Sequence, residues 1–509
     1  MKKLFLLIWA LALTLVGLTQ EKKKLEIIHA DEINMEPNIS DAQRLLGNVK
    51  FRYNQALMYC DSAYRYPNGD FDAFSNVRVL QGDTLQLYSD LLKIDKNSKV
   101  AKLRKNIRLK DKEMTLNTDH LDYDFETELA SYFGGGVIET SENNNRLESD
   151  QGFYDTKSKY FQFRDNVVLK NPEYRVESDT LRYSSNGSKA YFHGPTNIYF
   201  KDSEIYCENG WYDSNEDICQ FNENAIIRNG STFMSGDSIF YNGGNGRGEV
   251  FNNVEIRDTT SNYLILGQYG WHSEETGNSL VTDQAEMIQF FETDSLFLHA
   301  DTLKSYTDSL GTQKILAFNH VKFFKSDLQG KSDSLTYSEA DSTLSMFGSP
   351  IIWSKVNQIS GNQIDMNIHE GQIQRLVINS NSFIISEAGP GKYNQIKGKE
   401  TIGYFIDNEL HRIDVFGNGQ IVYFPTDDKS ENNDVIGMNL VECSDVVLTV
   451  KDNDIIKVAL LTKPSGALHP LDKTEESDFT LDGFFWDNIN RPISRSMIFE
   501  WVQNLQEAE

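Results

Sequence analysis

The sequence predicts an all-β protein built from repeated units of about 30 residues, each of which supplies two short strands. Two observations carry this prediction: an aspartate recurs at a near-constant interval, and an apolar segment led by Asn or Gly falls between successive aspartates. The composition agrees. The 30 Phe and 23 Tyr against 10 Pro favour strands, because aromatic rings pack well on a pleated surface.

The recurring aspartate marks the first strand of each unit. The intervals between Asp31, Asp61, Asp90, Asp119, Asp150 and Asp179 are 30, 29, 29, 31 and 29 residues. Alternation along a strand places Asp179, Leu181 and Tyr183 on one face and Thr180 and Arg182 on the other. We expect the aspartate to cap a turn or to bond backbone groups where the strand begins. Binding of a cation or an amine is the alternative.

The second strand of each unit begins with a residue that tolerates the left-handed conformation of a tight turn. This segment recurs at residues 47–51, 76–79, 106–109, 166–169, 224–227, 253–256 and 319–323. A single unit cannot bury its apolar face, whereas stacked copies can. About a dozen copies fit between residues 25 and 424.

The net charge argues against nucleic-acid binding, and the N-terminal segment indicates export. The net charge of −26 lacks the basic footprint of a nucleic-acid binder. Lys2 and Lys3 precede an apolar run at residues 4–18, and a charged stretch follows. This order is typical of a secretory signal peptide, which we place at residues 1–19; an uncleaved anchor is the alternative.

Side chains that carry chemistry are scattered. Cys60, Cys207, Cys219 and Cys443 match no zinc pattern. For Cys207 and Cys219, a disulfide and buried free thiols both remain open. Histidines show no metal spacing, Asp119, Asp122 and Asp124 do not match a calcium loop, and no nucleophile elbow or phosphate-binding loop is present. We therefore expect no catalytic site, no metal and no cofactor.

The repeated unit resembles the OstA-like family, which includes LptA and the N-terminal domain of LptD. Residues 178–183 and 47–51 show the resembling motif most clearly, and the resemblance covers residues 25–424. It implies an elongated β-jelly-roll, V-shaped in section, with an apolar groove along its length. It also implies that the groove holds the lipid A acyl chains of lipopolysaccharide on the way to the outer membrane.

The resemblance further implies a location and partners. Family members work in the periplasm with other lipopolysaccharide-transport components at the inner and outer membranes, and they associate end to end through open sheet edges. Outer-membrane association of this chain stays open. The chain is much longer than the compact bridge protein of the family. A role as bridge, translocon component or assembly factor therefore also stays open.

The groove candidates come from the inward positions of the first strands. They are Leu121, Tyr123, Leu181, Tyr183, Ile239, Tyr241, Leu303, Leu335, Tyr337, Ile364 and Met366. A closed core without a cavity is the alternative for these side chains. Two other functions compete with lipid transport: a structural or surface β-repeat protein, and a β-solenoid that acts on polysaccharide.

The sequence after residue 424 departs from the repeat. Residues 425–509 are expected to cap the sheet end, or to dock a partner through Phe484, Phe485 and Trp486. Within this segment, residues 446–451 and 455–461 read as strands, and residues 496–505 as a short helix.

Overall fold

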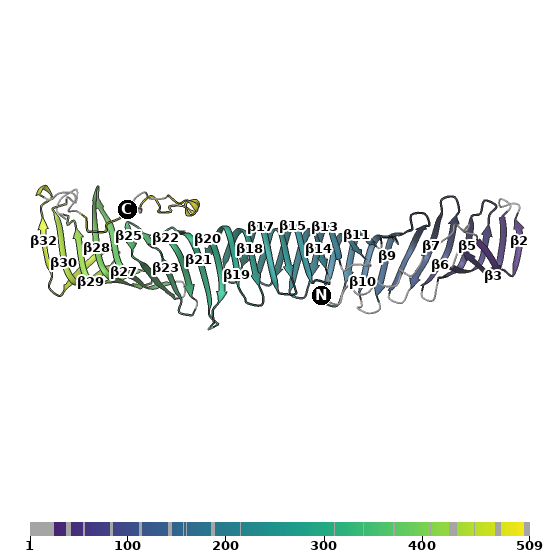
Figure 1. Cartoon of the computed structure of the whole chain (residues 1–509), viewed down its shortest axis with the longest axis horizontal. Helices are drawn as coiled ribbons and strands as arrows, with labels where there is room; N and C mark the ends of the chain where they lie inside the picture. The colour runs from purple at the N-terminus through teal and green to yellow at the C-terminus, as the bar shows by residue number, and fades with distance from the viewer. Residues whose placement is uncertain are drawn as a thin grey trace. The chain divides into compact units, whose positions relative to one another are not determined.

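The computed structural model describes residues 25–502 apart from short gaps, and it consists almost wholly of antiparallel strands (Figure 1). The gaps are residues 37–41, 54–55, 82–84, 111–113, 141–144, 156, 159, 185–188, 214, 310, 339, 370–371, 408, 427–434, 452–453 and 474–479. The signal peptide expected at residues 1–19 lies outside the described residues. The chain forms two compact units, residues 1–248 and 249–509, which divide inside β17 (Arg247–Asp258).

Unit 1 contains the strands before β17. They are β1 (Leu25–His29), β2 (Glu32–Glu36), β3 (Ala42–Tyr53), β4 (Ala56–Arg65), β5 (Phe71–Gln81), β6 (Leu85–Asp95), β7 (Val100–Lys110), β8 (Met114–Asp124), β9 (Leu129–Thr140), β10 (Arg146–Asp155), β11 (Tyr160–Lys170), β12 (Arg175–Ser184), β13 (Lys189–Tyr199), β14 (Ser203–Asp213), β15 (Ile218–Asn229) and β16 (Thr232–Asn242). From β3 to β16 each strand pairs antiparallel with the next. β1 and β2 both pair with β3.

Unit 2 is also built from antiparallel strands. Its strands are β18 (Tyr263–Ser273), β19 (Ser279–Phe290), β20 (Ser295–Thr307), β21 (Gln313–Lys325), β22 (Leu328–Ser338), β23 (Thr343–Phe347), β24 (Ile351–Ser354), β25 (Asn357–Ser360), β26 (Gln363–His369), β27 (Gln372–Gly389), β28 (Lys392–Ile406), β29 (Glu409–Tyr423), β30 (Met438–Lys451), β31 (Asp454–Leu461) and β32 (Ser465–His469). Strand pairing continues past residue 424, because β30 pairs with β29, β31 and β32. Among the described residues, two short 3₁₀ helices follow, Leu471–Lys473 and Arg495–Phe499. No helix in the described part of the chain is long and apolar enough to span a membrane.

Each long strand bends once at a corner near its middle. In unit 1 the corner residues of alternate strands are left-handed, as at Asn48 (φ 46°), Asn76 (φ 48°), Asn106 (φ 49°) and Asn166 (φ 52°). The strand register shifts at the same place, for example between Arg104 and Ile107 of β7. The Asn and Gly segments of the sequence therefore mark corners inside strands, and the two-strand unit consists of one hairpin of two bent strands.

The repeated aspartate secures the corner of the next strand. The amide nitrogen of Asn76 donates to Asp61 at 2.7 Å, that of Asn106 to Asp90 at 2.7 Å, and that of Asn166 to Asp150 at 2.7 Å. Where the corner is Gly194, a Cβ would lie 2.9 Å from Asp179. The aspartate thus has a structural role, but the prediction that it stands where a strand begins is wrong.

The corner also corrects the predicted faces of the strand. Leu181 and Tyr183 point inward and are buried, but Asp179 is exposed on the outside. The reason is that the bend between Ser178 and Thr180 interrupts the alternation of side chains.

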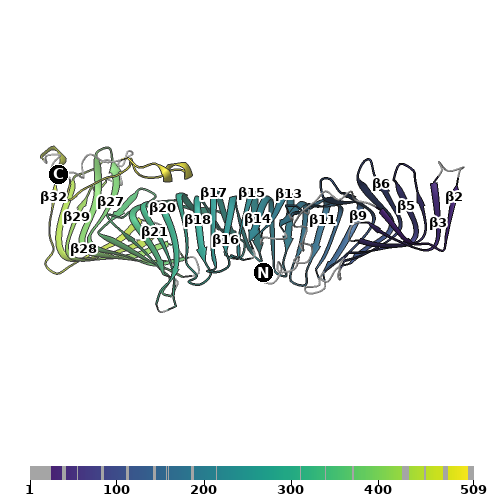
Figure 2. The same ribbon diagram turned by 45° about the vertical axis from the view of Figure 1, so that its right-hand side comes forward.

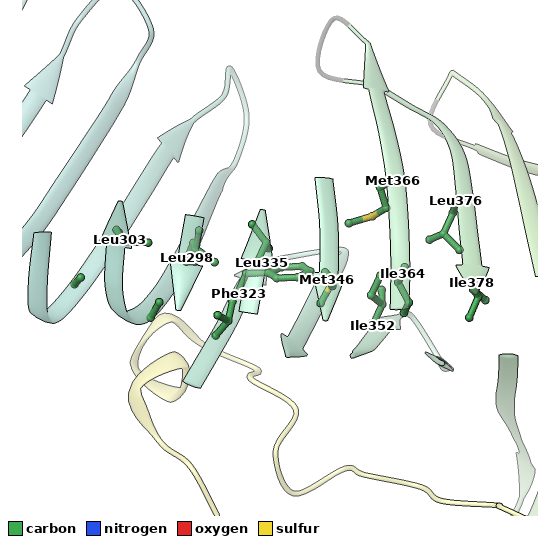
Figure 3. Close-up of a cluster of buried hydrophobic side chains, with 14 of the residues drawn as sticks. Leu298, Leu303, Phe323, Leu335, Met346, Ile352, Ile364, Met366, Leu376 and Ile378 are labelled. Carbon is green, nitrogen blue, oxygen red and sulfur yellow. The ribbon is translucent and has the colours of Figure 1, made fainter. Parts of the chain in front are cut away.

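The two halves of each bent strand face each other across one interior. The Phe51 and Phe71 rings come from opposite sides of the corners, and their centroids lie 4.3 Å apart. In unit 2, Leu298 and Leu303 flank the corner of β20 and belong to one buried cluster (Figure 3). The prediction of an all-β jelly-roll repeat is confirmed. Every strand pair described is antiparallel, so a β-solenoid with parallel coils is wrong.

Candidate functional site

A row of tyrosines lines one inner wall of unit 1. Its members lie one residue before the end of every second strand: Tyr123, Tyr154, Tyr183, Tyr212 and Tyr241. The register joins them across intervening strands through Ala130, Phe161, Ala190 and Cys219. Successive tyrosines are therefore about 10 Å apart, two strand spacings. We call these five residues the tyrosine row.

Small residues separate most members of the tyrosine row. Ala130 lies between Tyr123 and Tyr154, and Ala190 between Tyr183 and Tyr212. An alanine leaves room beside a large ring that a second large side chain would fill. Large rings therefore alternate with small side chains along most of this wall, near the ends of the strands.

The opposite inner wall is aliphatic over the same strands. In register from β7 to β16 stand Leu109, Leu116, Ile138, Leu147, Leu169, Val176, Ile198, Ile205, Ile227 and Met234. These ten residues, which we call the aliphatic row, are all buried or half-buried. They contain no polar side chain, so this wall offers only non-directional apolar contact.

Hydroxyl groups gather at the corner, where the two walls meet. The Ser178 and Thr196 side-chain oxygens lie 2.8 Å apart, and Tyr132 and Ser149 share a bond of 2.6 Å. These buried polar groups satisfy one another, which makes the corner a closed apex. The apolar rows lie farther out, toward the strand ends.

Burial raises the pKa of two members of the tyrosine row. Burial raises the pKa of Tyr183 to about 12. It also raises the pKa of Tyr212, whose hydroxyl donates to Asp217 at 3.1 Å. Neutral phenols preserve the apolar character of the wall, because an anion there would be poorly solvated.

The structure places all eleven predicted groove residues on the inside. Leu121, Leu181, Tyr183, Ile239, Leu303, Leu335, Ile364 and Met366 are buried, whereas Tyr123, Tyr241 and Tyr337 are half-buried. Leu303, Leu335, Ile364 and Met366 pack in one cluster of unit 2 (Figure 3). In the form described here, the chain's own side chains cover most of these positions.

Sequence reasoning missed two parts of the site. Tyr154 and Tyr212 belong to the tyrosine row, and their 29- to 31-residue spacing from Tyr123, Tyr183 and Tyr241 is visible in the sequence. The aliphatic row was also missed. Three of its members, Leu109, Leu169 and Ile227, end Asn-led segments, but only the corner shows that the row faces the tyrosines.

Two family descriptions match the chain, one in each unit. Residues 22–179 match the OstA-like protein family, and residues 291–372 match the family described as LptA/(LptD N-terminal domain) LPS transport protein. These two parts of the chain are therefore OstA/LptA-like. No curated protein matches this OstA-like chain. Among solved structures, the chain is similar to LptH of Pseudomonas aeruginosa, described as the LptA homologous periplasmic component of the lipopolysaccharide transport device. The identity is 19% over 20% of this chain and 77% of LptH, with a TM-score of 0.19.

The C-terminal segment of the OstA-like chain lies on the outer face of unit 2 (Figure 2). Leu481, Phe484 and Trp486 pack with Phe383 and Phe424, residues that point away from the interior. Residues 481–502 thus cover the sheet from outside; we call them the C-terminal strap.

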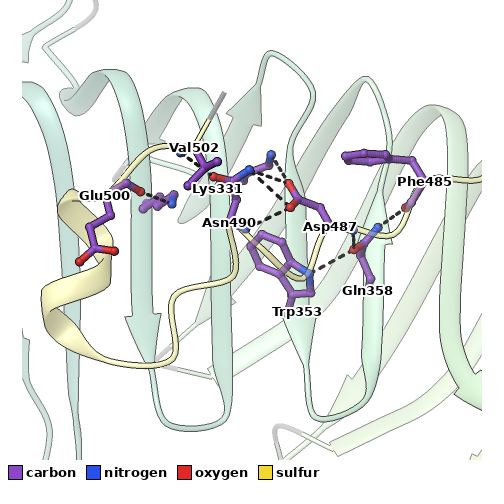
Figure 4. A network of polar contacts seen from close by, with 9 residues as sticks. Lys331, Trp353, Gln358, Phe485, Asp487, Asn490, Glu500 and Val502 are labelled. Carbon is purple, nitrogen blue, oxygen red and sulfur yellow. Dashed lines mark hydrogen bonds and ion pairs between the residues drawn. The ribbon is translucent and has the colours of Figure 1, made fainter. Parts of the chain in front are cut away.

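Buried polar groups hold the strap. Lys331 donates to Asp487 at 2.5 Å, and Gln358 donates to the Phe485 carbonyl at 2.6 Å (Figure 4). Burial favours the neutral form of Asp487, but the bonds from Lys331 and Asn490 lower its pKa below the usual value. The carboxylate therefore stays charged opposite the Lys331 ammonium.

A second lysine lies under the end of the strap. Lys322 donates to the Glu500 carbonyl, and its nitrogen lies 5.0 Å from the centre of the Trp501 ring. Burial, followed by the neighbouring Lys331, lowers the pKa of Lys322 to about 8. Trp501 in turn donates to the His320 carbonyl at 3.2 Å.

The remaining sequence candidates are structural. Cys207 and Cys219 are buried free thiols, so no disulfide joins them. Asp119 accepts a bond from the Asn106 backbone at 3.0 Å, and Asp122 pairs with Arg104 at 2.5 Å. Among the residues described, no group of three or more His, Cys, Asp or Glu side chains is placed to hold a metal ion.

Proposed function

We propose that this OstA-like protein carries lipopolysaccharide, with the acyl chains held in unit 1 between the tyrosine row and the aliphatic row. The observation that carries the proposal is the register itself, which aligns ten aliphatic side chains along one inner wall and five tyrosines along the other. Apolar contact stabilises an inserted acyl chain by about 0.8 kcal/mol per buried methylene.

The arrangement suits movement of the cargo. Because the aliphatic wall forms no hydrogen bonds to its cargo, an acyl chain slides along it without breaking directional bonds. The half-buried Tyr123 and Tyr241 stand near the strand ends, where cargo enters between the layers. Entry requires the layers to part, since most inner side chains are buried against one another.

The proposal also states where the protein acts and with which partners. The protein works in the periplasm, after removal of residues 1–19, and exchanges cargo with lipopolysaccharide-transport components at the inner and outer membranes. It acts by binding and has no catalytic role. Residues 25–424 carry the repeats, and residues 425–509 extend the sheet and end in the strap.

The open strand edges fit end-to-end association with such partners or with a second copy. At one edge of unit 1, β1 and β2 expose Ile28, Ile33 and Met35; in unit 2, β31 exposes Ile456 and Val458. Unpaired backbone groups beside apolar side chains favour the addition of another strand.

Photocrosslinking tests the proposal. A benzophenone amino acid replaces Tyr123, Tyr183 or Tyr241 in turn, and Arg182 serves as control because it is exposed on the outer face of β12. The purified protein is incubated with lipopolysaccharide, irradiated and resolved by electrophoresis. We expect adducts at the three tyrosine positions and none at Arg182.

Two outcomes would contradict the proposal. Equal adduct yields at Arg182 and at the tyrosines would mean that lipopolysaccharide adheres to the surface without entering. No adduct at any position in correctly folded protein would favour a structural or surface role, in which the interior is a closed core.

A further inference from the structure

A basic, aromatic ladder crosses the outer face of β3 to β7 in unit 1. The register aligns Lys50, Tyr59, Arg78, Tyr88 and Arg108 on five consecutive strands. All five point outward, since their neighbours Val49, Met58, Val77, Leu87 and Ile107 are buried. Cations and tyrosines therefore alternate along one line about 20 Å long.

This part of the sequence reverses the charge of the protein. From Arg44 to Lys110 the chain carries 13 Lys and Arg against six Asp and Glu, a formal charge of +7, whereas the whole sequence carries −26. The outer-face register continues the ladder from β10 to β12 with Glu148 and Glu177. The net positive charge thus belongs to β3 to β7, whereas the outer-face cations Arg146, Lys170 and Arg175 of β10 to β12 pair with Glu139, Glu148 and Glu177.

Among the described residues, the cations of the ladder and of the row beside it form no ion pair with a carboxylate. Other basic residues of these strands are paired: Lys93 with Asp72 at 3.3 Å, and Arg104 with Asp122 at 2.5 Å. By contrast, no carboxylate among the described residues lies within ion-pair distance of the following five: Lys50, Arg52, Arg78, Arg108 and Lys110. The corner carboxylates Asp61 and Asp90, each two residues from a ladder tyrosine, accept bonds from Asn76 and Asn106.

A second row beside the ladder adds apolar surface. Arg52, Leu57, Leu80, Gln86 and Lys110 follow in register, about 7 Å from the ladder. Leu57 and Leu80 are half-buried, and Tyr88 is 37% exposed. The face therefore combines five cations with two leucines and two tyrosines.

We propose that this face docks on an anionic phospholipid surface. Lysines and arginines attract anionic headgroups, and tyrosine side chains prefer the interface between water and acyl chains. An array of phosphates matches several cations spaced about 10 Å apart, where a single small anion would meet only one. The acidic remainder is repelled, so only this face approaches the membrane within the reach of screening, about 8 Å at physiological salt.

The lipopolysaccharide cargo is the less suitable occupant of this face. The ladder lies two residues from the corner, at Lys50 beside Asn48, and points outward. The tyrosine row lies at the opposite ends of the strands and points inward. Cargo held by the inner rows therefore does not reach the ladder.

Vesicle flotation tests the inference. The purified protein is mixed with vesicles of phosphatidylcholine alone or of phosphatidylcholine with phosphatidylglycerol, both free of lipopolysaccharide. We expect salt-sensitive binding to the anionic vesicles only. Arg78→Glu/Arg108→Glu should weaken it at least about ten-fold, and the milder Arg78→Gln/Arg108→Gln should weaken it less. The matched control is Lys157→Glu/Lys201→Glu, which changes the net charge equally at exposed turns and should bind as the wild type does.

Three results would overturn the inference. The wild type could fail to bind anionic vesicles. Both charge reversals could weaken binding equally, which would reflect net charge alone. Self-association at low salt, lost in Arg78→Glu/Arg108→Glu without any vesicle binding, would assign the face to the acidic surface of a second copy. Crosslinking of lipopolysaccharide at position 183 should persist in the ladder variant, which separates failure here from failure of the transport proposal.

Discussion

Arg495 of the C-terminal strap forms a two-pronged ion pair with Glu286 of β19, with both nitrogen–oxygen distances 2.7 Å. The Glu286 side chain is 4% exposed, although it belongs to the outer face of the strand. A carboxylate on an outer strand face is normally solvated, and here the strap both removes the water and supplies the charge that replaces it. The strap is therefore part of the folded unit.

Removing Arg495 should release the strap. In Arg495→Ala the Glu286 carboxylate stays buried without its partner, at a cost of about 2 kcal/mol, or roughly thirty-fold in local opening. Hydrogen exchange of residues 481–502 measures this loss of protection. The double variant Glu286→Leu/Arg495→Ala should recover part of it, because the uncompensated charge is gone. Equal protection in wild type and single variant would show that the apolar contacts of Leu481 and Trp486 alone hold the strap.

The corner asparagines should prefer glycine to alanine as a replacement. Asn106 has φ 49° and donates to Asp90. Asn106→Ala loses this bond and strains the left-handed backbone, at a combined cost of about 2 kcal/mol. Asn106→Gly loses only the bond and should cost about 1 kcal/mol or less.

Exchange of the β6–β8 amides measures both corner variants, since a long repeat array does not unfold in a single step. Asn117→Ala is the matched control, because Asn117 is exposed in the extended part of neighbouring β8. It should change exchange little. A glycine variant less stable than the alanine variant would show that backbone strain is not what selects asparagine.

The sequence was sufficient to predict the all-β repeat, the hairpin unit and the inward direction of residues such as Leu181 and Ile239, because these follow from spacing and alternation. Alternation failed at the corner. Asp179 is two residues from Leu181 yet faces outward, since the bend between them is invisible to a period of two. The same bend hid the aliphatic row opposite the tyrosines.

The contacts of the C-terminal strap on the outer face could not be predicted from the sequence, for a different reason. The strap joins residues far apart in the chain, such as Lys331 with Asp487, and no local pattern announces such a pair. Aromatic Phe484 and Trp486 indicated a docking segment, and the structure places both against the chain's own Tyr393. The basic ladder likewise depends on register, which aligns residues spaced irregularly along the sequence.

The buried thiols should make alkaline pH destabilising. Burial raises the pKa of Cys207 and Cys219 from 9.0 to about 12 in the folded protein. The folded state therefore holds these protons more tightly than the unfolded state. The resulting stability is present below pH 9 and is lost as the pH rises toward 12. We measure the midpoint temperature of thermal unfolding from pH 9 to pH 12. It should fall less steeply with pH in Cys207→Ala/Cys219→Ala than in the wild type. Identical slopes would mean that other groups, such as the tyrosines, account for the loss.

A charge on the aliphatic row should block lipid binding. Ile227 faces the interior and neighbouring Ile226 faces outward on the same strand; both are half-buried. Ile227→Asp places a carboxylate where acyl chains are proposed to lie, and we expect lipopolysaccharide crosslinking at position 183 to fall about ten-fold or more. Ile226→Asp, the matched control, should retain crosslinking. Equal loss in the two variants would point to damage to the fold, and equal retention would remove the aliphatic row from the site.

A charge on the last strand should prevent end-to-end association. Val458 of β31 is 50% exposed, although its register partner Leu448 is 1% exposed within the core. The inner apolar face thus continues to an edge with no further strand among the described residues.

If another chain adds a strand there, Val458→Lys should shift sedimentation velocity profiles toward the monomer, because a lysine at an edge opposes strand addition. Glu275→Lys, at an exposed turn, introduces the same side chain away from the edge and should leave association unchanged. Association that survives Val458→Lys would place the contact elsewhere, and the β1 and β2 edge with its exposed Ile33 would be the next position to alter.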